Sequence, residues 1–453
     1  MNNNERSKML GTMKMSKLVP KVSVPIMISL LVQALYNIVD SIFVAKYSPK
    51  ALTAVSLAFP IQMLMIAFST GFGTGINSVV SRKLGEKEMS EAKKCAGNGV
   101  FLEFCGFFMF FVFGLFFAKS TFNLLTDDST LRELGGSYLS IVCTCSLGLF
   151  MSIAFERLMQ CTGNTVLSMT TQLFGAITNI ILDPIMIFGY FGCPAMGIEG
   201  AAYATVIGQC AGMILGFFLN QIKNKELRLS FSDIKPKLER IKNILTVGIP
   251  STIMQSISTV MNLTFNMILL SYGEVAVSVL GIYFKLQSFV FMPVFGLSNG
   301  LVPIVGYNYG AKNRERVYSA IKTALIWAIT IMFLGTIVFM IFPENLLALF
   351  ESEGSGEITA IGTPALRTIC VHFVLAAVGI TLSTVFQAIG KGVYSMIMSF
   401  CRQLFVLIPA AFVLSELGGL SAVWWSFLIA EAVSLVICLV MYRRVDRRIF
   451  KWM

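Results

Sequence analysis

The chain has few of the side chains on which soluble enzymes and metalloproteins depend. Only 13% of its 453 residues are charged, and it contains a single histidine, His372. One histidine cannot supply a zinc-type site, so no metal centre is expected. The Gly-rich strings lie in apolar segments and lack the Walker pattern, so no nucleotide-driven energy source is expected. The sequence therefore predicts neither an enzyme nor a cofactor beyond a transported ion.

Signals for secretion and for disulfide bonding are also missing. Residues Met1–Ser16 are polar and basic, without the apolar segment and cleavage site of a signal peptide. The 10 cysteines lie mostly inside apolar runs, and only Cys143 and Cys145 are close in sequence. That position favours packing over metal or redox chemistry. The net charge of +11 does not indicate a nucleic-acid partner, because the basic residues lie in short loops between apolar runs.

What the sequence has in abundance is apolar surface. Its mean hydropathy is +0.76, and 56% of its residues are hydrophobic. A bilayer-spanning helix needs roughly 20 mostly apolar residues. We expect an all-α polytopic membrane protein with twelve transmembrane helices at about Val19–Ala45, Leu52–Val80, Ala96–Lys119, Leu134–Met159, Val166–Tyr190, Ile198–Gln221, Ile244–Ser271, Val275–Val305, Tyr318–Phe342, Leu366–Ala388, Tyr394–Leu414 and Leu420–Tyr442.

The distribution of lysine and arginine predicts the orientation. With twelve spans, almost every basic loop residue falls on the side of the two termini. The opposite side receives only Lys46, Lys50, Lys119, Arg132 and Arg367. Cytoplasmic loops of membrane proteins carry the excess of basic residues. We therefore expect an inner (cytoplasmic) membrane protein with both termini in the cytoplasm.

The two halves of the chain repeat each other. Pro25 and Pro250 differ by 225 positions, and Gly71-Phe-Gly-Thr-Gly75 matches Gly296-Leu-Ser-Asn-Gly300 at the same offset. Six spans per repeat is an even number, so both halves enter from the same side and form parallel repeats. The expected divisions are a cytoplasmic segment at 1–18, an N-lobe at 19–222, a basic linker at 223–242, a C-lobe at 243–442 and a cytoplasmic tail at 443–453.

The first span contains an acid that an apolar helix has no structural need for. Gln33, Asn37 and Asp40 are spaced so that they share one helical face. A carboxylate near the middle of a membrane helix costs about 2.5–3.5 kcal/mol, so such residues normally face a bundle interior or a wet cavity. The alternative is that Asp40 caps a helix break or reaches the interface.

The fifth span repeats this pattern with Gln172, Asn179 and Asp183. Counted at about 1.5 Å per residue, Asp40 and Asp183 lie at similar depth, and Tyr138 and Thr205 reach the same level. Two carboxylates in a poorly solvated pocket cannot both carry charge cheaply, so such a pair can bind and release a proton. A sodium ion would instead use both acids, with Asn37, Asn179 and Thr205 as further oxygen ligands.

The repeat breaks at these acids. At the offset of 225, Asp40 corresponds to Phe265 and Asp183 to Ile408. The sequence thus predicts a doubled scaffold whose functional acids belong to the N-lobe alone, which favours a chemical role over a structural one.

Several motifs together resemble the multidrug and toxic compound extrusion (MATE) family of cation-coupled exporters over nearly the full chain. They are Leu35-Tyr-Asn37-Ile-Val-Asp40, Gly71-Phe-Gly-Thr-Gly75, Ser81-Arg-Lys-Leu-Gly85, Gln160-Cys-Thr-Gly-Asn164 and Leu182-Asp-Pro184. The resemblance implies two six-helix bundles in a V with a central cleft. It also implies an N-lobe cation site made by Asp40, Asp183, Asn179, Tyr138 and Thr205, with a kink at Pro25.

The expected function follows from these features. We expect an antiporter that exports amphipathic, cationic aromatic drugs in exchange for H+ or Na+, working as a monomer in the lipid bilayer. Gln33 is a candidate for the substrate cleft. Lys285, inside the eighth span, is either a gate facing that cleft or a lysine that extends to the interface. A lipid-linked or oligosaccharide flippase is the first alternative, and a channel or sensor the second.

Overall fold

The computed structural model describes residues 6–350 and 356–453, and these residues form helices joined by short turns. Eleven helices are long and apolar enough to cross a membrane, and a pair bent by 43° supplies the twelfth span. The bent pair is α6 (Ser129–Thr144) and α7 (Leu147–Cys161). The expected all-α fold with twelve spans is confirmed.

The other helices of the N-terminal half are α1 (Lys8–Thr12), α2 (Met15–Tyr47), α3 (Pro49–Gly85), α4 (Met89–Phe116), α5 (Ala118–Leu125), α8 (Thr165–Phe188) and α9 (Gly197–Lys223). Those of the C-terminal half are α10 (Leu238–Leu270), α11 (Glu274–Gly310), α12 (Arg314–Ile341), α13 (Pro343–Ala348), α14 (Glu357–Ile369), α15 (Phe373–Ala388), α16 (Gly392–Phe400), α17 (Ile408–Val423) and α18 (Ser426–Arg448), with a π-helical turn η5 (Cys401–Leu407) between α16 and α17.

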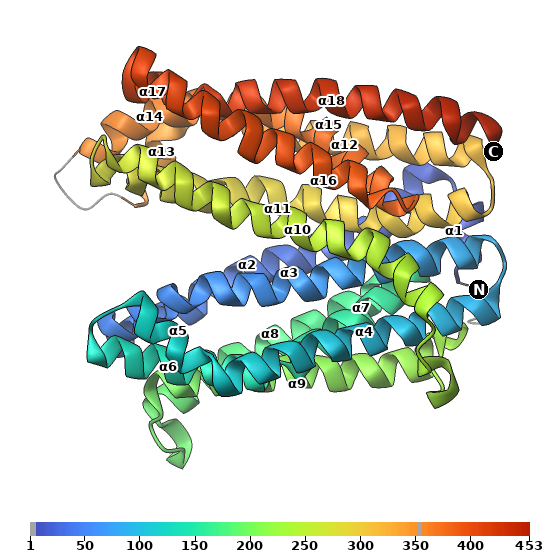
Figure 1. Ribbon diagram of the computed structural model, residues 1–453, viewed down its shortest axis with the longest axis horizontal. Helices are drawn as coiled ribbons and strands as arrows, with labels where there is room; N and C mark the ends of the chain where they lie inside the picture. Colours follow the sequence, from blue (N-terminus) through green and yellow to red (C-terminus); the bar gives the residue numbers. More distant parts are fainter. Residues whose placement is uncertain (1–5, 351–355) are drawn as a thin grey trace.

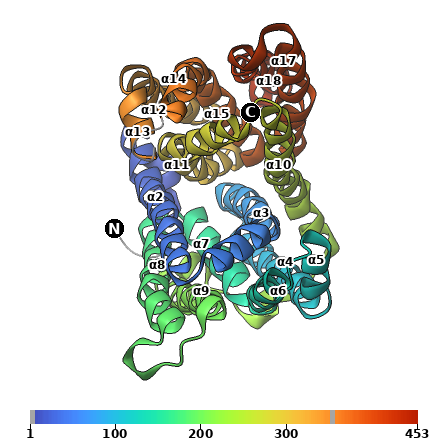
Figure 2. The same ribbon diagram turned by 90° about the vertical axis from the view of Figure 1, so that its left-hand side faces the viewer.

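The helices form two bundles, one from each half of the chain (Figure 1). Viewed along the bundles, α2 and α3 of the N-lobe face α10 and α11 of the C-lobe across the middle of the molecule (Figure 2). The two-bundle architecture expected from the repeat is thus confirmed. Any space between the lobes is bordered by these four helices.

The lobes meet closely at one end, which we call the terminal face. It carries α1, the 86–88 and 311–313 turns and the 224–237 connector. A Cβ added at Gly71 would lie 2.1 Å from Thr252 Oγ1, and one added at Gly310 would lie 2.1 Å from the Arg82 carbonyl oxygen. Only glycine permits such an approach of two backbones. Hydrogen bonds between the lobes cluster in the same half of the molecule: Ser23 to Leu297, Thr70 to Gln255, and Ser78 to Gln387.

Several expected boundaries need correction because the helices continue beyond the apolar runs. The first span begins at Met15, inside the predicted 1–18 segment, and α10 begins at Leu238, inside the predicted 223–242 linker. The last span begins at Ser426 rather than Leu420, because Gly419 has a φ of +64° and interrupts the preceding helix. Polar helix ends can extend past the hydrocarbon, since water satisfies them there.

Candidate functional site

The two predicted acids meet across a helix interface of the N-lobe. Asp40 comes from α2 and Asp183 from α8, two helices that pack together, and their carboxyl groups are close enough to interact directly. Asp183 has no solvent exposure. Because two carboxylates are both acceptors, a hydrogen bond between them needs one proton on the pair. The site can therefore hold a proton between two side chains.

Polar groups from five helices surround this pair. Asn179 Nδ2 donates to Asp183 Oδ1 at 3.2 Å and to Thr205 Oγ1 at 3.5 Å. Tyr36 and Tyr138 are close enough to interact electrostatically with both acids, and Gln62 Nε2 donates to the Tyr138 hydroxyl at 3.0 Å. The structure thus brings together Asp40, Asp183, Asn179, Tyr138 and Thr205, and adds Tyr36 and Gln62, which the sequence reading did not single out.

Oxygen atoms at this cluster remain without partners among the described residues. They are Asp40 Oδ1, Asp183 Oδ2 and Asn179 Oδ1, all buried from solvent. Buried polar atoms are normally hydrogen-bonded, and unpaired ones mark places where a ligand, ion or water binds. These three oxygens have the chemistry to accept a proton donor or to contact a cation.

Asn37 does not join the cluster. Its side chain is exposed, whereas the preceding Tyr36 lines the site. Three residues of helix rotate a side chain by about 300°, which leaves Asn37 about 60° away from Asp40. Pro25 lies within α2, which continues through it as a helix, and its carbonyl accepts from Ser29 Oγ at 3.1 Å. This arrangement therefore does not support Asn37 as a direct ligand of the ion. The kink expected at Pro25 stays a prediction.

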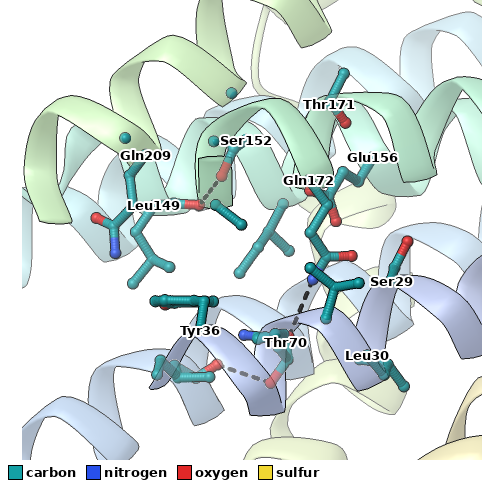
Figure 3. Close-up of a pocket in the computed structure, with 18 of the residues that line it drawn as sticks. Ser29, Leu30, Tyr36, Thr70, Leu149, Ser152, Glu156, Thr171, Gln172 and Gln209 are labelled. Carbon is teal, nitrogen blue, oxygen red and sulfur yellow. Dashed lines mark hydrogen bonds between the residues drawn. The ribbon is translucent and has the colours of Figure 1, made fainter. Parts of the chain in front are cut away.

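A chamber lies next to the acid pair, toward the terminal face. Its volume is about 140 Å³, similar to cavities that hold one benzene-sized ligand. Figure 3 shows the side chains around it. Gln33, the predicted cleft residue, lines the chamber, and its Oε1 accepts from Gln172 Nε2 at 3.0 Å. Other lining residues include Ile26, Ser29, Tyr36, Thr70, Ser152, Ile153, Glu156, Arg157, Gln160, Asn179, Thr205, Gln209 and, from the C-lobe, Asn299.

The chamber and the acid pair share a wall. Tyr36, Asn179 and Thr205 line the chamber; Tyr36 interacts electrostatically with both acids, and Asn179 donates hydrogen bonds to Asp183 and to Thr205. The acids themselves do not line it. A change in the charge of the acid pair therefore reaches a molecule in the chamber through these side chains.

Two charged chamber residues escaped the sequence reading. Glu156 and Arg157 are adjacent in α7, and both line the chamber. Arg157 interacts electrostatically with Glu156 and with Glu103 of α4, and it donates to Gln160 Oε1 at 2.8 Å. Glu103 is fully buried and accepts from Ser69 Oγ at 2.8 Å. The sequence signal that could have identified Glu156 and Arg157 is that two adjacent charged residues lie inside the apolar run 134–159.

The C-lobe contains a buried acid of its own, at a position that the comparison of Asp40 and Asp183 with the second repeat did not reveal. Glu431 of α18 is 4% exposed and accepts from Arg402 Nη1 at 3.4 Å. His372 is buried nearby, with Nδ1 2.6 Å from the Ile369 carbonyl oxygen and its ring against Phe427. At the offset of 225, Glu431 corresponds to Val206, so a comparison that starts from the N-lobe acids does not reveal it.

Lys285 lies away from the chamber. Its side chain is exposed on α11, and Nζ is 5.8 Å from the centre of the Phe350 ring. A cation over an aromatic ring near a helix end is typical of a lysine that extends toward the interface. The arrangement favours that reading over a gate at the N-lobe chamber.

Comparison with known proteins agrees with this architecture. The MatE family model matches residues 25–185 and 250–413, two segments whose starts differ by the repeat offset of 225. The chain is 29% identical to the multidrug export protein MepA of Staphylococcus haemolyticus over 91% of this chain and 89% of that protein. It is 28% identical to MepA of Staphylococcus aureus (strain MRSA252), over 94% and 93%.

Solved structures give the same assignment at the level of the fold. A structure described as the outward-facing conformation of a multidrug resistance MATE family transporter superposes with a TM-score of 0.92 at 26% identity, over 98% of both chains. A transporter of the MOP superfamily from Pyrococcus furiosus gives a TM-score of 0.90 at 26% identity, over 96% of this chain and 97% of that chain. The chain belongs to the MatE family of membrane transporters.

Proposed function

We propose that the protein is a multidrug efflux antiporter that exports amphipathic, cationic aromatic compounds in exchange for inward movement of H+ or Na+. The observation that carries this proposal is the shared wall between the chamber and the Asp40–Asp183 pair. Drug and ion then occupy neighbouring sites that communicate through Tyr36, Asn179 and Thr205. The names of the MepA relatives support the same class of substrate.

Exchange follows from competition across that wall. When the acid pair gains a positive charge from an ion, the local field becomes less favourable for a cationic drug. Each ligand therefore weakens the binding of the other, as thermodynamic linkage requires. Alternating access then delivers the ion to the cytoplasmic side and the drug to the outside.

The closeness of the two carboxyl groups supports the proton as the coupling ion, because a hydrogen bond between them would need a shared proton. Sodium is the alternative. It would separate the carboxyl groups and use Asn179 Oδ1, which has no partner among the described residues, as a ligand.

The basic loops at the terminal face support a cytoplasmic location for that face. With this orientation, the close approach of the lobes there corresponds to a state closed to the cytoplasm. The likeness to an outward-facing MATE transporter supports this reading.

The test uses purified protein in proteoliposomes loaded with ethidium, a lipophilic aromatic cation. Addition of a proton or a sodium gradient should drive ethidium movement against its own gradient, and ethidium should move the ion in the opposite direction. Proton-driven exchange without a sodium effect is expected. Ethidium movement that responds to neither ion would refute coupled antiport.

A further inference from the structure

Glu156 is the carboxylate that faces the substrate chamber directly. It lines the chamber, and Figure 3 places it beside Gln172 and Thr171. Its carboxylate has no hydrogen-bond or ion-pair partner in the described part of the chain, and its electrostatic neighbour is Arg157. Asp183, by contrast, does not line the chamber, so its oxygens lie behind the side chains of the chamber wall.

The electrostatic surroundings of Glu156 leave it available to a ligand. Arg157 interacts electrostatically with both Glu156 and Glu103, so Glu156 does not have this cation to itself. Glu103 is fully buried, whereas Glu156 is half-buried and lines the chamber. A cation in the chamber would therefore meet the Glu156 carboxyl group.

The position of Glu156 also separates it from the ion site. Its neighbour Gln172 lies 11 residues before Asp183 in α8, so the two are roughly 16 Å apart along the helix. One chamber thus has a carboxylate at its inner end and the ion-binding pair behind its outer end.

We propose that Glu156 binds the positively charged group of the exported substrate and thereby sets the preference of the chamber for cations over neutral compounds of the same shape. This assignment rests on the proposed function. The aromatic part of the substrate occupies the remaining apolar surface of Ile26 and Ile153.

The experiment compares binding of ethidium with binding of hydroethidine, its uncharged reduced form, to purified protein under argon. Glu156→Gln should weaken ethidium binding by about ten-fold or more, because the amide keeps the hydrogen-bond acceptor but loses the ionic attraction to the cation. Hydroethidine binding should change by less than two-fold. Glu156→Asp, which keeps the charge, should restore most of the cation preference.

The matched control is Glu199→Gln, the same substitution at an exposed position of α9 outside the chamber. It should bind both compounds as the wild type does. If Glu156→Gln binds ethidium as tightly as the wild type does, the assignment of Glu156 is refuted, but the proposed function is not. Failure of the wild type to bind ethidium would refute the proposed substrate class as well.

A second, independent observation concerns the N-terminal segment. Residues 6–13, which include α1, lie across the terminal face and bind both lobes. Ser7 N–H donates to both carboxylate oxygens of Glu226, at 3.1 and 3.2 Å, and Arg6 donates to Asn164 Oδ1. Both partners belong to the N-lobe or to the connector that follows it.

The same segment is held by the C-lobe. Asn308 Nδ2 donates to the Leu10 carbonyl at 2.9 Å, and Arg316 Nη2 donates to the carbonyls of Leu10 and Met13 at 3.1 and 2.8 Å. Leu10 has no exposed surface, and the Tyr307 ring packs against Gly11. Separation of the lobes at this face must therefore break one of the two sets of contacts.

We infer that residues 6–13 form a latch that stabilises the state in which the lobes are closed at the terminal face. Its contacts hold only while α11 and α12 stay next to the connector around Glu226. Release of either end should favour the conformation open at this face.

The test measures the distance between spin labels at Glu88 and Lys322, exposed residues of the two lobes near the terminal face, in a variant without native cysteines. Arg316→Gln removes the guanidinium that donates to the Leu10 and Met13 carbonyls, and leaves the Asn308 hydrogen bond as the C-lobe contact. Ser7→Pro removes the N–H donor at a φ of −60° that proline also adopts. Each variant should raise the ratio of long to short distances by roughly five-fold, the effect of losing about one or two hydrogen bonds.

Arg314→Gln is the matched control, because Arg314 contacts Tyr318 rather than the segment. It should leave the distances unchanged. Wild-type distance distributions in both Arg316→Gln and Ser7→Pro would refute the latch. If Arg316→Gln does not fold, Ser7→Pro decides by itself.

Discussion

At the scale of single residues, the molecule depends on a few ionisable side chains placed inside an apolar bundle. Asp40 and Asp183 contact each other, and Glu156 faces the neighbouring chamber. Each costs free energy to bury, and no structural requirement of a helix is met by any of them. The free energy spent on burying them is best explained by the binding of cations.

The first prediction concerns the acid pair. Asp183→Asn should reduce ion-coupled ethidium export at least ten-fold, because asparagine keeps the size of the side chain but cannot titrate. Asp40→Asn should have the same effect, since the two groups act as one site. Thermal unfolding should stay close to that of the wild type, because removal of an intramembrane charge eases insertion. Normal export by either variant with an intact gradient would contradict the proposed mechanism.

The pH dependence of binding follows from the same pair. If the coupling ion is a proton, protonation of the pair opposes binding of a cationic drug, so ethidium affinity should fall as pH decreases. Asp40→Asn should flatten this dependence. Titration of ethidium binding between mildly acidic and mildly alkaline pH, with and without sodium, checks the sign. A decrease caused by sodium but not by acid would assign the site to sodium.

Asn179 and Asn37 form a matched pair for substitution. The sequence predicts both as ligands of the ion, whereas the structure places only Asn179 in the cluster. Asn179 hydrogen-bonds to Asp183 and is 3% exposed, whereas Asn37 is exposed outside the cluster. Asn179→Ala should reduce coupled export by about ten-fold, because a buried carboxyl group loses its donor. Asn37→Ala should stay within two-fold of the wild type. Equal loss in both variants would restore Asn37 as a ligand of the site.

At the scale of helices, the close contact between α3 and α10 decides how the lobes close. A Cβ at Gly71 would also lie 2.8 Å from the Thr252 backbone nitrogen and 3.0 Å from the Gly248 carbonyl oxygen. Backbone atoms cannot rotate away as a flexible side chain can, so the helices themselves would have to move apart. Small residues are the usual means of close helix approach in membranes.

The corresponding prediction is that Gly71→Ala opens the terminal face. The added methyl group should raise the ratio of long to short distances between labels at Glu88 and Lys322 by several-fold. Gly281→Ala in α11, where a Cβ meets nothing within 4 Å, is the control and should have no effect. Unchanged distances in Gly71→Ala would mean that the contact yields without lobe movement.

At the scale of the whole molecule, the two lobes share a scaffold but differ in chemistry. The chamber and the acid pair belong to the N-lobe, whereas the C-lobe contains a buried Glu431–Arg402 pair. An acid with its own cation is already compensated, so it has less need of a transported ion than Asp40 and Asp183 have. The repeat thus supplies two similar bundles, and the proposed transport chemistry lies mainly in the N-lobe.

Topology is the prediction at this scale. In a variant without native cysteines, a cysteine at Asp127 should react with an impermeant reagent added outside the cell, and one at Lys235 should not. Reaction of position 235 from outside would reverse the orientation. Glu351, another candidate for outside labelling, lies outside the described residues, and Asp127 serves that purpose because its side chain is fully exposed.

The sequence by itself determined the number of spans, the parallel repeat and the helices that carry the two acids. The reason is that a bilayer offers no partner for backbone groups, so each long apolar run must become a helix. The distribution of Lys and Arg is also read directly from the order of residues along the chain. The same is true of the 225-residue repeat offset. All twelve spans, and the similar depth of Asp40 and Asp183 in their helices, follow from such linear signals.

The tertiary structure alone decided which side chains meet. Whether Tyr36 or Asn37 faces Asp183 depends on the rotation of α2 against α8, and spacing within one helix cannot supply that angle. Glu156 became a chamber residue only through the packing of α7 beside α8 and α9. The contacts of residues 6–13 join positions about 300 residues apart, such as Leu10 and Asn308. Interactions of this kind arise from packing in three dimensions, because no periodicity along the chain encodes them.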